Sequence, residues 1–450
     1  MKIRALYLLF GMTCLVSCKE YLDVKPDKKL VVPVTLQDMQ AILNNVNLLN
    51  VNYPSIGETA ADDYYLTYED WAALRIGEDQ STYIWGDMAP RLAQWNAPYK
   101  CIFTANLVLE TIEKKGVDNK AGRIGWDHAK GTALFFRGFN FFQLAQLFAK
   151  PYDEEDPEKG WGIPLRLTSN IHDKTVRASV NETYDRILQD LTEAAELLPI
   201  ETAFKTRPNK AAAFGVLARA YLVMGKHELA GAYADSCLQL QNYLIDYNTL
   251  DPEADFPLAR FNEEVLFHAV AYSPTISPSI CKVDTLLYRS YAEDDLRRVI
   301  FFQENQDGSA AFKGSYDGEN YGTIFNGITS AEMYLVMAES LARKNDVNNA
   351  MRYLNNLLKK RYEKDAFSPI SASDANEALE IILSHRRKEL IFRGLRWSDL
   401  RRLNSEDRFK KTLKRKLGEQ TYELPPNDPR YVFLIPDEII DMSGIPQNER

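Results

Sequence analysis

The chain has 450 residues, of which 45% are hydrophobic and 26% charged, and this composition is that of an ordinary globular protein. Its formal net charge is −9, and a chain with this acidic balance is a poor binder of nucleic acid, because phosphate binding depends on an excess of lysine and arginine, so we expect no nucleic-acid partner. Beyond the first 17 residues no stretch of 18 apolar residues occurs, so we expect no permanent membrane-spanning helix.

Residues 1–17 have the pattern of a secretion signal. Lys2 and Arg4 precede an apolar run over residues 5–16, which is shorter than the roughly 20 residues that span a bilayer. Leu15-Val16-Ser17-Cys18 resembles the bacterial lipobox, in which cleavage leaves a lipidated cysteine first. Cys14 competes less well, because Gly11 stands where that motif has a branched apolar residue. We predict a lipoprotein signal at 1–17 and lipidation of Cys18; a simple secretory signal with a chance cysteine is the alternative.

Helical periodicity dominates the next part of the chain. Apolar residues recur at helical spacing over 99–115, 128–148 and 181–198, with Asn181 as the expected N-cap of the third stretch. Pro151 and Pro199 end the second and third stretches.

Two later segments share one spacing pattern. Their matching residues are separated by 3, 4, 5, 4 and 3 positions, which is the tetratricopeptide rhythm of two antiparallel helices joined at a Gly or Asn turn. Either segment alone could be any helical hairpin. A third pair is split by an insertion, and we predict helix pairs near 131–198, 211–240 and 331–361. The matching residues are Ala218, Tyr221, Gly225, Ala230, Ala234 and Cys237 in one segment and Ala338, Leu341, Asn345, Ala350, Leu354 and Leu357 in the other.

Residues 54–98 and 245–327 are different, because they are rich in Tyr, Asp, Gly and Pro and have weak periodicity. Such long loops are commonly functional. The predicted fold class is therefore mainly α, a tetratricopeptide-like helical repeat scaffold with large irregular loop insertions. Three cysteines beyond the signal, Cys101, Cys237 and Cys281, are too few for a disulfide framework, and we expect buried free thiols rather than one disulfide pair.

Several motifs along the chain resemble the SusD/RagB family of Bacteroidetes outer-membrane nutrient-binding lipoproteins. The most specific is the run from Arg387 to Arg402, although Arg393 stands where the family usually has Glu. The others are Cys18 to Pro26, Ala133 to Leu144, Lys150-Pro151-Tyr152, Gly162-Ile163-Pro164-Leu165, Phe433 to Ile439 and Pro446-Gln447-Asn448.

This resemblance implies a single SusD-like domain over 18–450 and a place on the outer membrane, lipid-anchored and facing the exterior. It implies capture of oligosaccharides, or of peptides in some members, and delivery to a SusC-like TonB-dependent transporter. We therefore expect a binding protein and not an enzyme. Within the Arg387–Arg402 run, Glu389 with Arg393 and Asp399 with Arg402 are spaced for helical ion pairs, so we interpret that run as a structural network rather than a binding site.

Catalytic and metal-binding motifs are not evident. None of the five histidines has metal-ligand spacing, and no Gly-x-Ser-x-Gly elbow or phosphate-binding Gly loop occurs. Paired carboxylates at Asp62-Asp63 and Glu69-Asp70 leave a surface glycoside hydrolase as the alternative function. We favour a hydrated or sugar-binding rim. Segments 305–308 and 317–320 carry oxygen ligands suited to calcium but are equally typical of turns, and we predict no cofactor and no metal site.

Aromatic side chains in the two irregular regions are the candidate ligand-binding residues. Neutral sugars stack their CH faces on aromatic rings while nearby polar groups bind their hydroxyls. We select five aromatic residues that stand beside polar or glycine neighbours, although packing inside the loops is the alternative for each; Trp95 and Tyr99 are assigned to the core. The five are Tyr68, Trp71, Trp85, Tyr316 and Tyr321.

Overall fold

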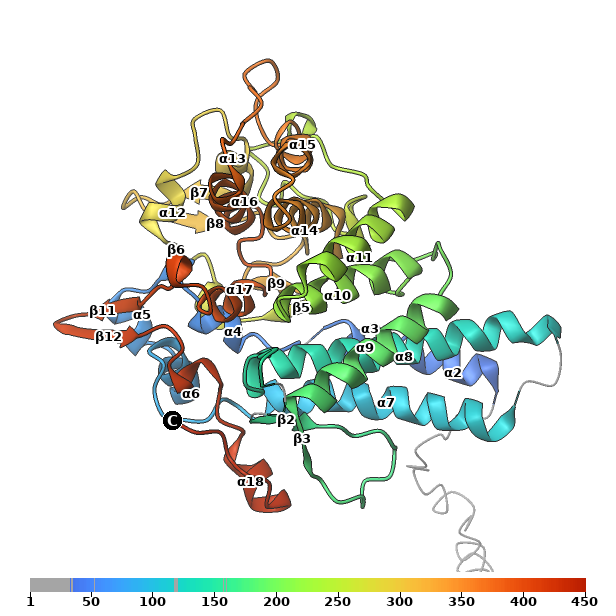
Figure 1. The fold of residues 1–450 in the computed structure, drawn as a ribbon. Helices are drawn as coiled ribbons and strands as arrows, with labels where there is room; N and C mark the ends of the chain where they lie inside the picture. Colours follow the sequence, from blue (N-terminus) through green and yellow to red (C-terminus); the bar gives the residue numbers. More distant parts are fainter. Residues whose placement is uncertain (1–32, 34, 52, 117–119, 157, 159) are drawn as a thin grey trace, which may run out of the picture.

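The computed structural model of the protein describes residues 33, 35–51, 53–116, 120–156, 158 and 160–450 (Figure 1). The predicted signal segment 1–17 and Cys18 lie outside these residues. The described chain forms 17 α-helices and six short two-stranded antiparallel sheets, so the prediction of a mainly helical fold is confirmed. No helix in the described ranges has both the length and the apolar character needed to cross a membrane.

Three long helices of the first half lie side by side: α7 (Ala93–Lys115), α8 (Lys120–Phe148) and α9 (Val180–Leu197) (Figure 1). The hydroxyl of Ser179 accepts a hydrogen bond from the Glu182 N–H, and the Glu182 carboxylate accepts one from the Ser179 N–H. This capping box is worth about 1 kcal/mol and starts α9. The expectation that Asn181 is the N-cap is therefore wrong by two residues.

The helical layer continues through α10 (Lys210–Val223), α11 (His227–Leu240), α14 (Ser330–Arg343), α15 (Val347–Leu358) and α16 (Ala375–Glu389). Each packs on its predecessor in this order except that α16 packs mainly on α14. The predicted repeats at 211–240 and 331–361 coincide with α10/α11 and α14/α15. The chain leaves the layer after α11 and returns to it at α14, which packs directly on α11.

Small residues set the spacing in this layer. Gly225 and Asn345, the predicted turn residues, have φ of +74° and +64°, a conformation that Gly and Asn adopt most readily. Gly231 on α11 faces α14 so closely that a Cβ atom there would collide with Ser340 Oγ. At Gly231, α11 therefore approaches α14 closely because no side chain of α11 stands between them.

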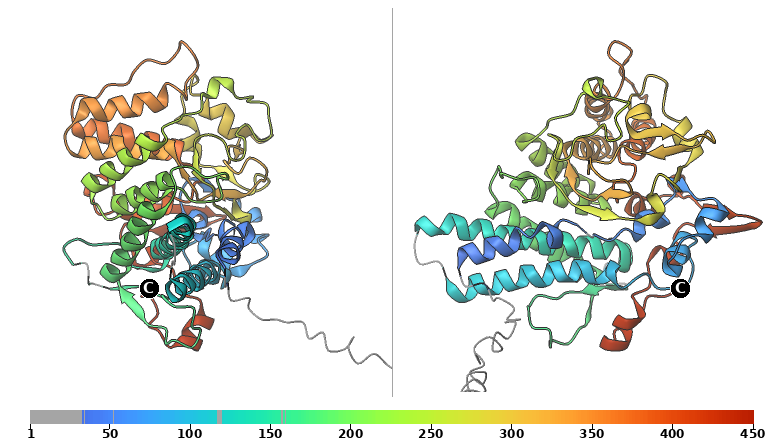
Figure 2. Two further views of the ribbon diagram at one scale, coloured as in Figure 1. Left: turned by 90° about the vertical axis from the view of Figure 1, so that its right-hand side faces the viewer. Right: turned by 180° about the vertical axis from the view of Figure 1, so that it is seen from behind.

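The two irregular regions consist of short elements, as predicted. Figure 2 shows that the yellow segments after residue 250 and the blue segments before residue 90 lie on one side of the molecule. The first region, with the segment before it, contains α2 (Leu36–Leu43), α3 (Val46–Leu49), α4 (Ile56–Ala60), β1 (Tyr64–Tyr65), α5 (Tyr68–Ala72) and α6 (Gly77–Tyr83). The second contains β4 (Val265–Phe267), β5 (Val270–Tyr272), β6 (Lys282–Val283), α12 (Thr285–Arg289), α13 (Arg297–Phe301), β7 (Phe302–Glu304), β8 (Ala310–Phe312) and β9 (Thr323–Phe325), and β10 (Ile328–Thr329) follows it.

Strand pairing ties these regions together. β1 pairs with β6, so Tyr64 lies opposite Val283, and β4 pairs with β10, β5 with β9 and β7 with β8. The remaining elements are β2 (Trp161–Pro164), which pairs with β3 (Arg177–Ser179), then α17 (Arg396–Leu403), the hairpin of β11 (Leu413–Leu417) and β12 (Gln420–Leu424), and α18 (Asp437–Ser443).

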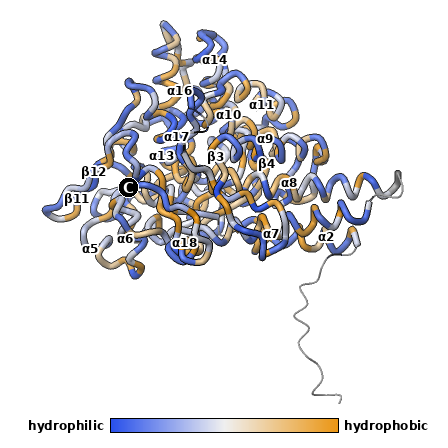
Figure 3. Tube along the Cα trace, turned by 60° about the horizontal axis from the view of Figure 1, so that its bottom comes forward, coloured by the Kyte–Doolittle hydropathy of each residue, from blue (hydrophilic) through white to orange (hydrophobic). Residues whose placement is uncertain are grey.

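The main core lies between the long helices and the irregular regions. Phe267 of β4 inserts among three rings of α8, with centroid distances of 4.8 Å to Phe135, 5.8 Å to Phe136 and 5.7 Å to Phe139. Hydrophobic and hydrophilic residues alternate along the helices, whereas hydrophilic residues dominate the β11–β12 hairpin (Figure 3). Cys101, Cys237 and Cys281 are buried and free, which confirms the expectation of buried thiols.

Candidate functional site

Two of the five predicted ligand-binding residues lie in the core. Trp85 is 3% exposed, and its indole N–H donates to the Ala60 carbonyl at 3.0 Å. Tyr316 is 0% exposed, and its hydroxyl donates to Glu264 Oε2 at 2.6 Å. The polar neighbours that suggested exposure of Tyr316 are themselves buried, because Ser315 and Asp317 bond inside the same turn. The structure thus corrects the assignment of Trp85 and Tyr316.

Tyr68 and Trp71 do lie at the surface, on α5. Tyr68 is 51% exposed, Trp71 is half-buried, and their ring centroids are 6.1 Å apart. The Thr67 hydroxyl caps α5 by accepting from the Asp70 N–H at 3.1 Å. Gln80 fixes the indole, because its carbonyl accepts from Trp71 Nε1 at 3.1 Å while its side-chain amide donates to the Trp71 carbonyl at 3.2 Å. These bonds hold the Trp71 indole in place on α5.

Tyr321 is also exposed, and it has an aromatic neighbour that the sequence did not single out. It is 41% exposed and packs on Phe256 with a centroid distance of 4.6 Å. Tyr272, at the end of β5, is 57% exposed. Gly322, at φ +74°, lets the chain pass the Tyr272 ring, because a Cβ atom there would lie 3.1 Å from it. The sequence did not indicate that Tyr272 is exposed, because it directly follows the apolar run Ala269-Val270-Ala271.

The segments that carry these residues adjoin each other, although the sequence separates them by about two hundred residues. The Thr59 and Ser273 hydroxyls lie 3.0 Å apart, and the Tyr64 hydroxyl donates to Thr275 Oγ1 at 2.9 Å. Ser273 follows Tyr272 directly, and Tyr64 lies four residues before the start of α5. We call the exposed Tyr68, Tyr272 and Tyr321, together with the half-buried Trp71 beside Tyr68, the exposed aromatic set.

Asp62 and Asp63, which the hydrolase alternative would use, are held in ion pairs. Asp62 accepts from Arg396 Nε at 2.6 Å and from Lys411 Nζ at 2.6 Å, and Asp63 accepts from Arg387 Nε at 2.8 Å. Burial alone would raise the pKa of Asp62, but Arg396, Arg387 and Lys411 together hold it well below its usual value. With these cations beside it, Asp62 is a poor proton donor, and the ion pairs of both carboxylates fix the segment that leads to α5.

The Arg387–Arg402 run forms a structural network, with one predicted pair present and one absent. Arg402 Nε and Asp399 Oδ1 are 2.7 Å apart, as the spacing predicts. Glu389 does not pair with Arg393, because α16 ends at Glu389 and the chain turns at Phe392 and Gly394, whose φ values are +52° and +67°. The prediction of a Glu389–Arg393 pair is therefore wrong.

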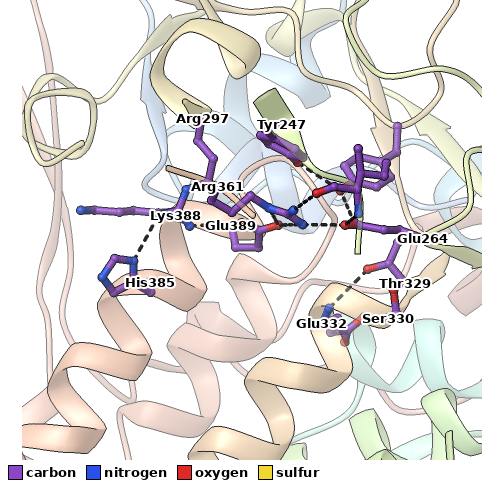
Figure 4. Close-up of polar contacts among 12 residues, drawn as sticks. Tyr247, Glu264, Arg297, Thr329, Ser330, Glu332, Arg361, His385, Lys388 and Glu389 are labelled. Atoms are coloured by element: carbon purple, nitrogen blue, oxygen red, sulfur yellow. Dashed lines mark hydrogen bonds and ion pairs between the residues drawn. The ribbon is translucent and has the colours of Figure 1, made fainter. Parts of the chain in front are cut away.

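Glu389 instead joins a buried group of charges (Figure 4). It accepts from Arg361 Nε at 2.9 Å and from Arg297 Nη1 at 3.1 Å, and Arg361 Nη2 also donates to Glu264 Oε1 at 2.8 Å. Arg361 lies over the Tyr247 ring, 4.1 Å from its centroid. These partners come from distant segments and join α16 to the second irregular region. Tyr316 belongs to the same network through its bond to Glu264.

No group of three or more His, Cys, Asp or Glu in the described ranges is placed to hold a metal ion. In the 305–308 turn, the Asp307 carboxylate accepts from the Ser309 N–H and pairs with Lys282 at 3.3 Å. In the 317–320 turn, Asp317 lies 3.6 Å from Arg260. Both segments form turns whose acidic groups have protein partners.

Two family models match this chain. The family model described as "starch-binding associating with outer membrane" matches residues 20–222, and the model described as "SusD family" matches residues 304–438. The chain belongs to the SusD/RagB family. Its relative SusD-like protein P2 of Formosa agariphila is 24% identical over 382 residues, which are 69% of this chain and 71% of that protein.

Solved SusD structures share the fold. A SusD superfamily protein from Bacteroides thetaiotaomicron VPI-5482 is 24% identical, with a TM-score of 0.75 over 93% of this chain and 100% of that one. A SusD-like carbohydrate binding protein from Bacteroides vulgatus ATCC 8482 is 21% identical, with a TM-score of 0.66 over 91% of this chain and 96% of that one. A laminarin binding SusD-like protein is 17% identical, with a TM-score of 0.63 over 91% and 97%.

Proposed function

We propose that this SusD-family protein captures oligosaccharides at the cell surface through the exposed aromatic set and delivers them to a TonB-dependent transporter. The observation that carries the ligand proposal is the exposed aromatic set itself, which lies on adjoining segments whose polar bonds fix it in place. The names of relatives support the same class of ligand, since one matching family model is called starch-binding and one solved relative is called laminarin binding.

Sugar chemistry suits this arrangement. An aromatic ring offers contact area to the CH face of a sugar at little entropic cost and leaves the sugar hydroxyls free for hydrogen bonds. Tyr68 and Tyr321 also carry hydroxyl groups, and Glu69 next to Tyr68 is exposed. We therefore expect a neutral oligosaccharide to bind in preference to a peptide.

Replacing Trp71 or Tyr272 with alanine is expected to weaken glycan binding by about 1–3 kcal/mol each, the scale of losing an aromatic contact. Calorimetry with oligosaccharides of laminarin and of starch, chosen after a glycan array, measures this. Trp161→Ala is the matched control, because Trp161 is an exposed indole on β2, outside the exposed aromatic set. Equal affinity of all three variants and the parent would remove these residues from the site, and a protein that binds peptides but no glycan would contradict the ligand class.

The place of action follows from the same proposal. We propose that acyl chains on Cys18 anchor the protein to the outer membrane, facing the exterior, beside its transporter. Purification from native membranes in mild detergent is expected to recover a TonB-dependent barrel with the parent protein. In cells that lack the barrel, the Cys18→Ala variant is expected to be absent from the membrane fraction and to be recovered as a soluble protein. Repeated recovery of the parent protein alone, or retention of the variant in those membranes, would contradict the partner or the anchor respectively.

A further inference from the structure

A cleft of about 590 Å³ lies apart from the exposed aromatic set, between the C-terminal end of α8, the α10–α11 turn, α17 and the segment 427–449. None of the exposed aromatic set lines it. Its volume falls within the range of small-molecule sites. Leu222, Val223, Met224 and the Tyr152 ring give it an apolar wall, and Arg401, Asn404 and Tyr431 give it a polar one.

Arg401 is the unbalanced charge of this cleft. Its terminal nitrogens donate to the Gln146 carbonyl and, at 2.5 Å, to the Ala149 carbonyl, both at the end of α8. Among the described residues no carboxylate pairs with it within 4.0 Å, whereas Arg402 has Glu339 and Asp399. Burial lowers the pKa of Arg401 to about 10, so the guanidinium is charged at neutral pH. The partial negative charge of the helix end compensates it only in part.

The acidic groups around the cleft do not neutralise Arg401, because most have their own cations. Glu449 pairs with Lys150 at 3.2 Å, Glu406 with Arg343 at 2.6 Å, Asp428 with Arg430 at 2.8 Å and Glu154 with Lys226 at 3.9 Å. Asp153, the remaining carboxylate of the lining, is exposed to solvent, where water and salt screen it.

Three polar atoms of the same wall lack hydrogen-bond partners. They are Arg401 Nε and Asn404 Nδ2, which can only donate, and Tyr431 Oη. Burial raises the pKa of the Tyr431 hydroxyl to about 12, and the nearby Asn404 amide opposes this shift without reaching hydrogen-bond geometry. A buried donor without a partner costs about 1–3 kcal/mol, so three on one wall indicate a missing acceptor.

We propose that this cleft is a second ligand site, which binds a small organic carboxylate whose oxygens accept hydrogen bonds from Arg401, Asn404 and Tyr431. The apolar wall contacts the body of the ligand, and the carboxylate supplies the counter-charge that Arg401 lacks. The three atoms are covered in the free protein, so binding includes small rotations of the side chains that carry them. The site does not depend on glycan capture by the exposed aromatic set.

Calorimetry with two carboxylate probes and their neutral counterparts tests the proposal: digalacturonate against its methyl ester, and an N-acetylated dipeptide against its C-terminal amide. We expect one carboxylate to bind and its neutral counterpart to fail. Binding of the uronate identifies an acidic sugar as the source of the ligand, and binding of the dipeptide identifies a peptide. If neither carboxylate binds at millimolar concentration, or if the ester or amide binds equally well, the proposal is overturned.

Two variants link the binding to the wall. Tyr431→Phe is expected to weaken it roughly tenfold, because a hydrogen bond to a carboxylate is lost. Asn404→Asp is expected to abolish it, because the new carboxylate lies on the same wall of the cleft and repels the carboxylate of the ligand. Neither change removes a hydrogen bond made by the unpartnered atom, and each replaces an unsatisfied buried group, so neither variant should melt below the parent; this separates loss of binding from loss of fold. Parent-like affinity in a folded Asn404→Asp variant would overturn the assignment.

Discussion

Replacing Arg361 with methionine is expected to lower the free energy of unfolding by about 3–5 kcal/mol, because the change leaves buried carboxylates without their cationic partner. Arg361 is fully buried and donates to both Glu264 and Glu389, at 2.8 and 2.9 Å. Methionine keeps much of the side-chain volume but offers neither charge nor donors. Glu264 and Glu389 would then have to stay charged without this partner or take up protons on folding. Urea unfolding of the parent and the variant measures the loss.

Arg352→Met is the matched control, because Arg352 is an exposed arginine of α15 and should cost no more than about 0.5 kcal/mol. Adding Glu264→Gln to Arg361→Met is expected to restore part of the lost stability, since it removes one of the stranded charges. If Arg361→Met cost no more than the control, the buried charges of Figure 4 would not stabilise the connection between α16 and the second irregular region.

We also expect the free energy of unfolding to depend strongly on pH, because of Glu58. It is buried on α4, and Gly394 N–H donates to it at 2.9 Å. Burial raises the pKa of Glu58 from 4.5 to about 8, and repulsion from Asp63 adds to the shift. Between these values the folded protein holds a proton that the unfolded chain releases. The stability that this proton contributes is therefore fully present below pH 4.5 and is lost as the pH rises through about 8.

Glu58→Gln, a neutral mimic, is expected to remove this loss. At low pH the two proteins should be similarly stable, and above pH 8 the variant should be more stable by up to about 5 kcal/mol. Unfolding curves at a series of pH values measure the difference. Glu69→Gln, the same change at an exposed position, controls for the removal of one negative charge. Parallel pH profiles of parent and Glu58→Gln would mean that Glu58 is ionised in the folded protein at neutral pH.

Local signals in the sequence predicted local structure well. Helical spacing and the residues Gly225 and Asn345 are properties of a few consecutive turns, and the structure has helices and positive-φ turns there. The Asp399–Arg402 pair likewise lies within one helix turn. The same rule fails where the helix stops. Glu389 does not pair with Arg393, because α16 ends at Glu389. Spacing rules hold only while the helix continues.

The candidate site was less predictable, because burial depends on partners from distant segments. Trp85 stands before Gly86-Asp87, which suggested exposure, but its indole N–H bonds to Ala60 and Arg415 lies near its ring. Tyr316 is buried by Glu264 and Tyr247, neither of which is near it in sequence. Conversely, Tyr272 ends an apolar run and yet is exposed. Among the described strands β5 pairs only with β9, and Tyr272 is the last residue of β5.

The ion pairs of Asp62 and Asp63 also bear on how the chain folds. Asp62 and Arg396 are 334 positions apart, and Asp63 and Arg387 are 324 apart. Closing loops of this length is slow, because chain entropy is lost before the contact forms. The segment leading to Tyr68 and Trp71 therefore cannot reach its final position until α16 and α17 are available to pair with it. We expect the α5 part of the exposed aromatic set to be among the last parts of the folding chain to reach its final arrangement.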